Sequence, residues 1–291
     1  MASPIPYPHV SIPFGSNEVA PAHGSMDRLT SITGIGRSLQ PDLESHRIAL
    51  AGAVLAAVSY TAVAVVTERE LTDALIAGIV VFIAWAVGRE LDPDRPGVAA
   101  WSIPIAFAAS IHDLPSAVAS AVALIGIRLV AGTIGAAVTW LDVAAFAVLG
   151  LAAGSTAGLW IVAVTMAIWL WTAPEVGRLK YAALGSLTAG AGASLYVFES
   201  QDAVITQEAY VLAAVAGIVM MLAMRPSTVV STTDARTGPI HGGRIDLARK
   251  AAGAFVMWAA VMGGVEGFWM VSPVLAGLMA TAVAKWFSRG A

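Results

Sequence analysis

Long apolar segments recur along the chain after residue 46, and they constrain the fold more than any other feature. Each is close to the ~20 residues that a helix needs to cross ~30 Å of hydrocarbon. Backbone polar groups in lipid must be hydrogen-bonded internally, and strand-like alternation is absent, so the segments are expected to be helices. We count ten: 47–66, 71–88, 97–111, 114–131, 137–154, 157–173, 181–198, 208–224, 247–263 and 269–286. The sequence therefore predicts an all-α polytopic membrane protein with about ten transmembrane helices.

The composition favours the same fold class, because charged residues are too few to cover a soluble surface. Only 12% of the 291 residues are charged, whereas a soluble domain typically has about 25%. The chain contains no cysteine, which excludes disulfides, thiolate catalysis and cysteine-ligated metals. The net charge of −3 gives no indication of nucleic-acid binding. The expected partner is a lipid bilayer, and nucleic acid is not expected.

Lysine and arginine are distributed unevenly between alternate loops. With the N-terminus placed in the cytoplasm, the inward-facing loops hold nearly all of them, and the outward-facing loops hold only Arg69. An excess of positive residues in cytoplasmic loops is typical of membrane proteins. The alternation predicts two cytoplasmic termini, a cytoplasmic segment over 26–46, and a transmembrane domain over 47–291 with a cytoplasmic loop at 225–246. The bias and the compact loops favour a multi-pass protein of a prokaryote-like inner (plasma) membrane.

The first 25 residues differ from the rest, because they are rich in proline, glycine and serine. A segment of this composition does not fold alone. Residues 1–25 are either an added leader, which ends in Gly24-Ser25 before a start at Met26, or a native extended arm. A native arm would pack on a partner subunit or on the protein's own membrane domain.

Two of the apolar segments contain residues that interrupt helices. The third segment is the shortest and contains Pro104, which predicts a kinked, tilted or re-entrant helix. The glycines around Glu266 predict either a tight turn or a broken helix near the outer surface. Broken helices are frequent at the binding sites of transporters.

The most polar stretch is GRELDPDRPG, residues 88–97, between two apolar segments. Glu90, Asp92 and Asp94 alternate, so in an extended loop their carboxylates would lie on one side. Oxygen ligands of this kind suit Mg²⁺ or Mn²⁺, which makes the three residues a candidate metal site. The alternative is an ordinary turn, in which the prolines end helices and the arginines neutralise acids and anchor at lipid headgroups.

Arg128 and Asp142 are a candidate substrate-binding pair. Each lies one to two turns inside the cytoplasmic end of its predicted helix, or about 7–9 Å deep at 1.5 Å per residue. Ionisable groups at such depth are expected to pair and to face the bundle interior. A structural ion pair that joins the two helices is the alternative to a substrate or proton site.

The predicted loop 225–246 contains Pro-Ile-His-Gly-Gly-Arg-Ile-Asp, residues 239–246. This stretch resembles the signature of CDP-diacylglycerol synthases, Pro-Gly-His-Gly-Gly-x-x-Asp-Arg-x-Asp. The resemblance implies a cytoplasmic site for cytidylyl transfer to a lipid phosphate, with His241 and Asp246 as candidate catalytic residues and a divalent cation such as Mg²⁺ as cofactor. The chain departs from the signature at Leu247, where the family has arginine, and at Arg249, where it has the final aspartate.

The predicted helix count also carries a functional indication. Ten helices with both ends inside divide into two halves of five, 47–155 and 157–286, and an odd-numbered half gives its copy inverted topology. This plan resembles that of ten-helix drug/metabolite transporters. A small-molecule transporter is therefore the first functional expectation. A membrane-embedded lipid-phosphate or nucleotidyl transferase and a non-catalytic subunit of a membrane complex are the alternatives.

Overall fold

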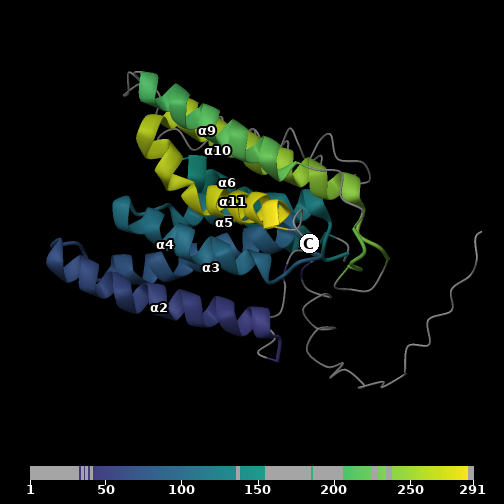
Figure 1. The fold of residues 1–291 in the computed structure, drawn as a ribbon, viewed down its shortest axis with the longest axis horizontal. Helices are drawn as coiled ribbons and strands as arrows, with labels where there is room; N and C mark the ends of the chain where they lie inside the picture. Colours follow the sequence, from purple (N-terminus) through teal and green to yellow (C-terminus); the bar gives the residue numbers. More distant parts are fainter. Residues whose placement is uncertain are drawn as a thin grey trace, which may run out of the picture.

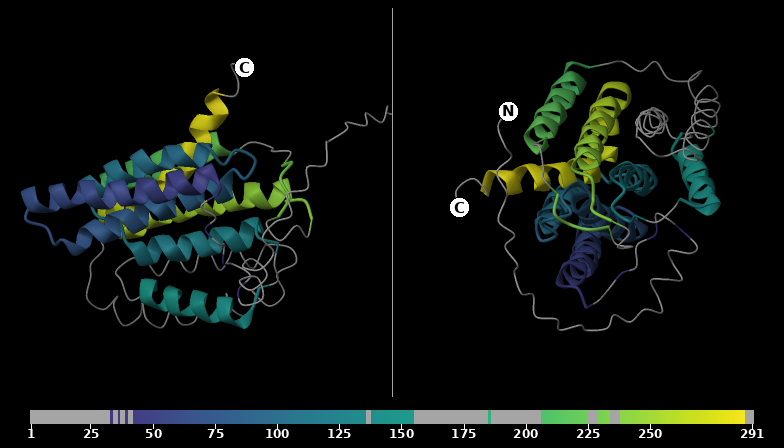
Figure 2. Two further views of the ribbon diagram at one scale, coloured as in Figure 1. Left: turned by 90° about the horizontal axis from the view of Figure 1, so that it is seen from below. Right: turned by 90° about the vertical axis from the view of Figure 1, so that its right-hand side faces the viewer.

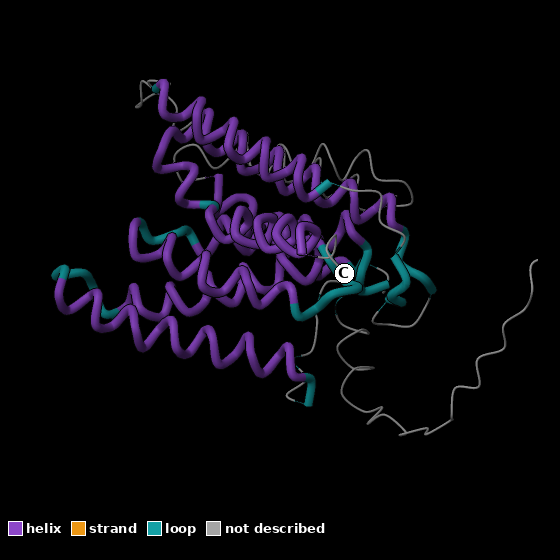
Figure 3. The backbone as a smooth tube through the Cα atoms, in the orientation of Figure 1, coloured by secondary structure: helices purple, strands orange, loops and turns teal. Residues whose placement is uncertain are grey.

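The described part of the chain is built from helices. The computed structural model describes residues 33, 36, 39, 42–135, 138–154, 185, 206–224, 229–233 and 238–287, and within them the only strand-like pairing is an isolated bridge between Thr232 and Pro239. In chain order, the elements are α2 (Glu44–Val66), α3 (Thr72–Leu91), the 3₁₀ helix η1 (Val98–Trp101), α4 (Ser102–His112), α5 (Ala117–Ala131), α6 (Trp140–Gly154), α9 (Gln207–Ala223), α10 (Gly242–Met270) and α11 (Ser272–Phe287) (Figures 1 and 3).

Three of the described helices, α2, α3 and α10, are long and apolar enough to cross a membrane, as expected for a membrane protein. The other described apolar helices are shorter, with 10–17 residues. The long and the short described helices together coincide with the first five and the last three predicted segments. The predicted segments 157–173 and 181–198 and the arm 1–25 lie outside the described residues. The count of ten spans therefore stays a prediction.

Two boundaries differ from the sequence-based expectation. Helix α10 begins at Gly242, inside the predicted loop 225–246. His241, the residue before it, has extended backbone angles, and the helix starts directly after it. The third predicted segment is the short 3₁₀ helix η1 followed by α4, and Pro104 is the third residue of α4. A proline in the first turn of a helix removes no intrahelical hydrogen bond, so it is accommodated at this junction.

The described helices run between two opposite ends of the bundle (Figure 1). At one end, Ser116 N donates to Met270 O, which joins the start of α5 to the end of α10. At the other, Arg249 in the second turn of α10 reaches the last residue of α3, Leu91. We call the second end the arginine end, after Arg89, Arg95, Arg128, Arg244 and Arg249. We call the first the acidic end, after Glu68, Glu70, Asp73, Asp113, Glu208 and Glu266.

The core is centred on α3, which packs against α2, α4, α5 and α11. A close approach of α3 and α11 requires glycine, since a Cβ on Gly277 would lie 2.9 Å from the backbone nitrogen of Gly88. In a membrane, the hydrophobic effect does not drive helices together, so close van der Waals packing between small residues stabilises their contacts. Helix α2 lies at the margin and exposes Val54, Leu55 and Val58 by more than 60% each, which suits a surface in contact with lipid (Figure 2).

Candidate functional site

Glu90 is fully buried in the last turn of α3, and both of its carboxylate oxygens accept hydrogen bonds. Arg128 Nε of α5 donates to Oε1 at 2.9 Å, and the Thr133 hydroxyl donates to Oε2. The structure thus pairs Arg128 with Glu90, a partner that the sequence did not predict. Helix α5 packs against α3 as well as against α6, and the carboxylate that reaches Arg128 comes from α3.

Asp142 stabilises the start of α6. Its Oδ2 accepts from Thr139 N at 2.8 Å and from the Thr139 hydroxyl at 3.0 Å, while Asp142 N donates to Thr139 Oγ1 at 3.4 Å. This reciprocal arrangement is a capping box, which satisfies backbone N–H groups that the first turn of a helix leaves unpaired. Thr33 from the N-terminal segment also donates its hydroxyl to Asp142 Oδ1. The contacts of Asp142 explain its burial without a substrate.

Asp92 and Asp94 lie in the turn after α3, and they face different partners. Asp92 pairs with Arg95 at 2.8 Å, and Arg95 also donates to the carbonyl of Ala284 in α11 at 3.3 Å. Asp94 accepts from Ser231 N at 2.8 Å and from Ser231 Oγ at 2.5 Å. Burial raises the pKa of Asp94, but hydrogen bonds from Ser231 and Val230 outweigh it, so the pKa lies below its ordinary value.

The candidate metal triad of Glu90, Asp92 and Asp94 does not assemble. Its alternation required an extended loop, whereas α3 continues to Leu91 and places Glu90 inside the bundle. Across the described part of the chain, no group of three or more histidine, aspartate or glutamate side chains is arranged to hold a metal ion. Each of the three carboxylates instead receives hydrogen bonds from protein groups.

The segment with the CDP-diacylglycerol synthase resemblance is the first turns of α10. His241 is exposed at the position before the helix, and its side chain makes no capping hydrogen bond. Asp246 pairs with Arg249 at 2.9 Å, and Arg249 Nε donates to Leu91 O at the same distance. Arg249 is only 1% exposed, and Asp92 attracts it as well. The carboxylate of Asp246 is thus paired with a guanidinium in the structure.

Three arginines close the ends of three helices at the arginine end. Arg244 donates to Leu129 O at 2.8 Å and to Val130 O at 2.9 Å in the last turn of α5. Arg249 and Arg95 reach carbonyls near the ends of α3 and α11 in the same way. The last carbonyls of a helix lack intrahelical donors and carry partial negative charge, so they favour cations. Sequence reasoning missed these contacts, because a cap that comes from another helix leaves no local pattern.

Helix α10 is broken near the acidic end. Gly264 has φ 64° and ψ −150°, which is not a helical conformation and which residues with a Cβ rarely adopt. Beyond it, the chain turns back so closely that a Cβ on Gly267 would lie 2.3 Å from Ala259 O. Of the two conformations expected for this glycine-rich stretch, the structure has the broken helix.

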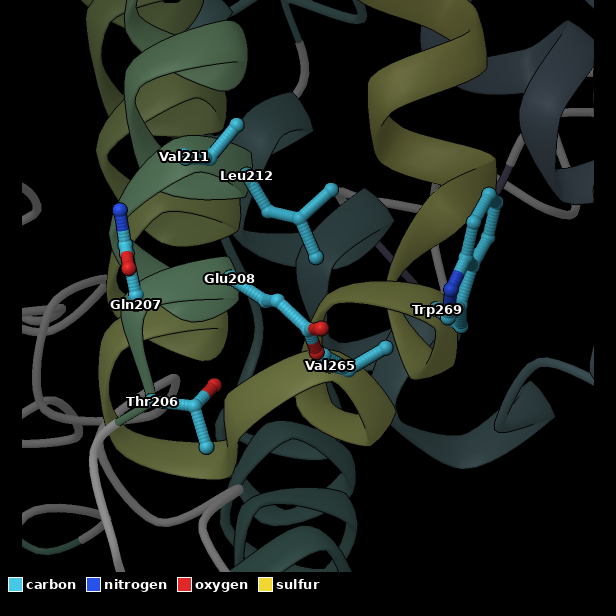
Figure 4. Close-up of a pocket in the computed structure, with 7 residues that line it drawn as sticks. All are labelled: Thr206, Gln207, Glu208, Val211, Leu212, Val265 and Trp269. Atoms are coloured by element: carbon cyan, nitrogen blue, oxygen red, sulfur yellow. The ribbon is translucent and has the colours of Figure 1, made fainter.

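An open pocket of about 700 Å³ lies beside this break, between the start of α9 and the end of α10 (Figure 4). Glu208 extends from the first turn of α9 toward Val265, and Trp269 stands on the opposite wall. Val211 and Leu212 supply an apolar wall from α9. The volume is in the range of pockets that bind small molecules, about 300–1,000 Å³. Glu208 is the first residue of the predicted segment 208–224 and lies in the first turn of α9.

The wall that carries Trp269 is held by aromatic contacts. The ring centroid of Trp269 lies 4.6 Å from that of His112 at the end of α4 and 5.3 Å from that of Phe268. Both pairs are edge-to-face. Edge-to-face pairs are among the preferred geometries of aromatic side chains. The indole is therefore fixed by α4 before any ligand enters.

Comparisons of the chain with protein-family models, curated proteins and solved structures found no match. The class of protein that the fold defines is a helical protein with apolar helices able to cross a membrane. Its function has to be argued from the two ends of the bundle.

Proposed function

We propose that the protein is a small-molecule transporter of a prokaryotic inner membrane, with ten spans and with its arginine end and both termini in the cytoplasm. Three long apolar helices support the membrane assignment, and the exposed aliphatic side chains of α2 suit a lipid environment. The positive-inside bias supports the orientation, because the described arginines other than Arg69 gather at one end.

The observation that carries the proposal is a difference between the two ends. At the arginine end, four sets of hydrogen bonds join residues before 155 to residues after 157, which are the two predicted halves. These cross-half hydrogen bonds are Asp94 with Val230 and Ser231, Arg95 with Ala284, Arg244 with Leu129 and Val130, and Arg249 with Leu91. At the acidic end, Ser116 N donates to Met270 O across the two halves, and the pocket is open beside the broken α10.

A bundle that is closed at one end and open at the other is one state of an alternating-access cycle. In the opposite state, the cross-half hydrogen bonds separate and the acidic end closes around the pocket. The break at Gly264 supplies a position at which the end of α10 can move without unwinding the rest of the helix. The short, exposed contact between Asp94 and Ser231 is the easiest of the four to open, because water can replace both partners.

A reversible cross-link tests the cycle, and the cysteine-free chain makes the test clean. The variant combines Asp94→Cys and Ser231→Cys, which close the arginine end upon oxidation, with Val211→Cys in the pocket. Labelling of Cys at position 211 by an impermeant maleimide is measured by peptide mass spectrometry in proteoliposomes. We expect faster labelling in the oxidised protein, because the lock holds the pocket open.

Equal labelling before and after oxidation would contradict alternating access and favour a static membrane subunit. The Val211→Cys single variant under the same oxidant is the matched control, and its labelling rate should not change. The readout is confined to the one peptide that contains position 211.

A further inference from the structure

The pocket at the acidic end has a chemical character that restricts what it can bind. Its walls are mostly apolar, with Val211, Leu212 and Val265 beside the indole of Trp269. The only charged side chain among its described lining residues is Glu208 (Figure 4). A ligand that matches these walls needs an apolar or aromatic body and one positive charge.

The position of Glu208 is defined by the start of α9. Thr206 precedes the helix, and its hydroxyl accepts a hydrogen bond from Ala209 N at 3.3 Å, which fixes the first turn. The carboxylate therefore projects from a capped turn, across the opening from Trp269. Cations are attracted both to a carboxylate and to the face of an indole ring.

The charge of the whole acidic end favours the same class of ligand. Among its described residues, six carboxylates stand against Arg69 alone as a permanent cation. Arg69 also lies away from the pocket, because its guanidinium donates to Tyr60 Oη of α2 at 2.6 Å. An end with this charge raises the local concentration of cations and repels anions.

We propose that the pocket between α9 and the broken end of α10 binds organic cations with an apolar or aromatic body, with Glu208 as the counter-charge and Trp269 as the stacking wall. As the substrate class of a transporter, this assignment rests on the proposed function. As a binding site, it stands on the pocket alone.

Two ions of the same shape and opposite charge test the assignment directly. Binding of tetraphenylphosphonium and of tetraphenylborate is measured by equilibrium dialysis on the full chain in a neutral detergent. We expect the cation to bind and the anion to bind far more weakly, because both have the same apolar body and only their charges differ. Glu208→Gln should weaken cation binding by roughly tenfold or more, with a smaller effect at high salt.

Glu266→Gln is the matched control, because Glu266 is exposed at the same end but does not line the pocket. It should leave cation binding within about twofold of the unchanged chain, since an exposed charge outside the pocket is screened by water and salt. Glu208→Lys gives a result that misfolding cannot imitate, because it should reverse the preference and make tetraphenylborate the tighter ligand. Trp269→Leu should weaken cation binding and leave the charge preference in place.

Equal affinity for the two ions, or equal losses from Glu208→Gln and Glu266→Gln, would overturn the proposal. Its failure is distinguishable from failure of the transport function. Cation binding at Glu208 without any effect of the arginine-end cross-link on pocket labelling would retain the site and remove the transporter. An effect of the cross-link without selective cation binding would retain the transporter and remove the substrate class.

Discussion

At the scale of single residues, the arginine end shows how buried charge is tolerated in an apolar bundle. Glu90 has a hydrogen-bond donor on each oxygen, from Arg128 and from Thr133. The bare carboxylate would be costly at this depth, and the pairing compensates for its lost hydration. The pair therefore joins α3 to α5, and its removal should affect stability before it affects any ligand.

Glu90→Ala should destabilise the protein by about 3 kcal/mol, because it removes the carboxylate that pairs with the largely buried Arg128 side chain. Unfolding in a denaturant titration in detergent micelles measures the change. The double variant Glu90→Leu with Arg128→Met should lose less than Glu90→Ala alone. A double variant that is less stable than the single one would mean that the ion pair is not the source of the effect.

Asp94 predicts a pH dependence with a definite sign. Its pKa in the folded protein lies below the ordinary value of 3.8, so the carboxylate stabilises the loop at neutral pH. A group with a depressed pKa loses its contribution as the pH falls through that pKa in the folded state. Protection of the Val230 and Ser231 amides from hydrogen exchange should therefore persist at pH 5 and higher, and weaken only below 3.8.

Asp94→Asn should weaken this amide protection at every pH, because a neutral amide oxygen is a poorer acceptor than a carboxylate. Thr232→Ala is the matched control, since Thr232 is exposed in the same loop and its pairing with Pro239 is made by the backbone. Equal loss of protection in both variants would show that the loop, and not the carboxylate, determines the exchange.

At the scale of elements, helix ends determine how the bundle is joined, and α5 is the clearest case. Helix α5 ends at Ala131 and is capped by Gly132, which has a φ of 66°, and Arg244 from α10 lies directly against that glycine. A Cβ at this position would lie 2.5 Å from Arg244 Cζ. Only glycine both adopts the left-handed conformation without strain and leaves room for the guanidinium.

Gly132→Ala should lower stability by about 1–2 kcal/mol from the backbone conformation alone, with an additional loss from the displaced Arg244 contact. Thermal unfolding of the purified protein measures both. Gly243→Ala is the matched control, because a Cβ there meets no atom within 4 Å. In a chain that already carries Arg244→Ala, Gly132→Ala should cause a smaller loss of stability. If the loss is unchanged, the steric part of the explanation is wrong.

The same elements show what the sequence could and could not predict. Apolar runs of about twenty residues predicted where the described helices lie, since burial in lipid depends on local composition. They could not predict which helices pack together, and the packing of α5 against α3 determined that Arg128 meets Glu90. The candidate metal site was wrong for a related reason, because the end of α3 at Leu91, beyond the predicted boundary, determines where Glu90 points.

At the scale of the whole molecule, the two ends differ in charge as well as in closure. The arginine end combines its cations with helix carbonyls and buried acids, whereas the acidic end has solvent-accessible carboxylates and an open pocket lined by one of them, Glu208. Charge asymmetry of this kind determines orientation during membrane insertion, because positive residues are retained on the cytoplasmic side. The orientation in turn determines from which side the pocket is reached.

Single cysteines introduced into the cysteine-free chain should report this orientation directly. Glu266→Cys at the acidic end should react with a membrane-impermeant maleimide in intact cells, because the proposed orientation places it on the outer side. Thr232→Cys at the arginine end should react only after the membrane is permeabilised. Both positions are exposed in the folded chain, so a difference in labelling reflects the side of the membrane and not burial. The opposite pattern would place the pocket in the cytoplasm, and the closed arginine end would then face outward.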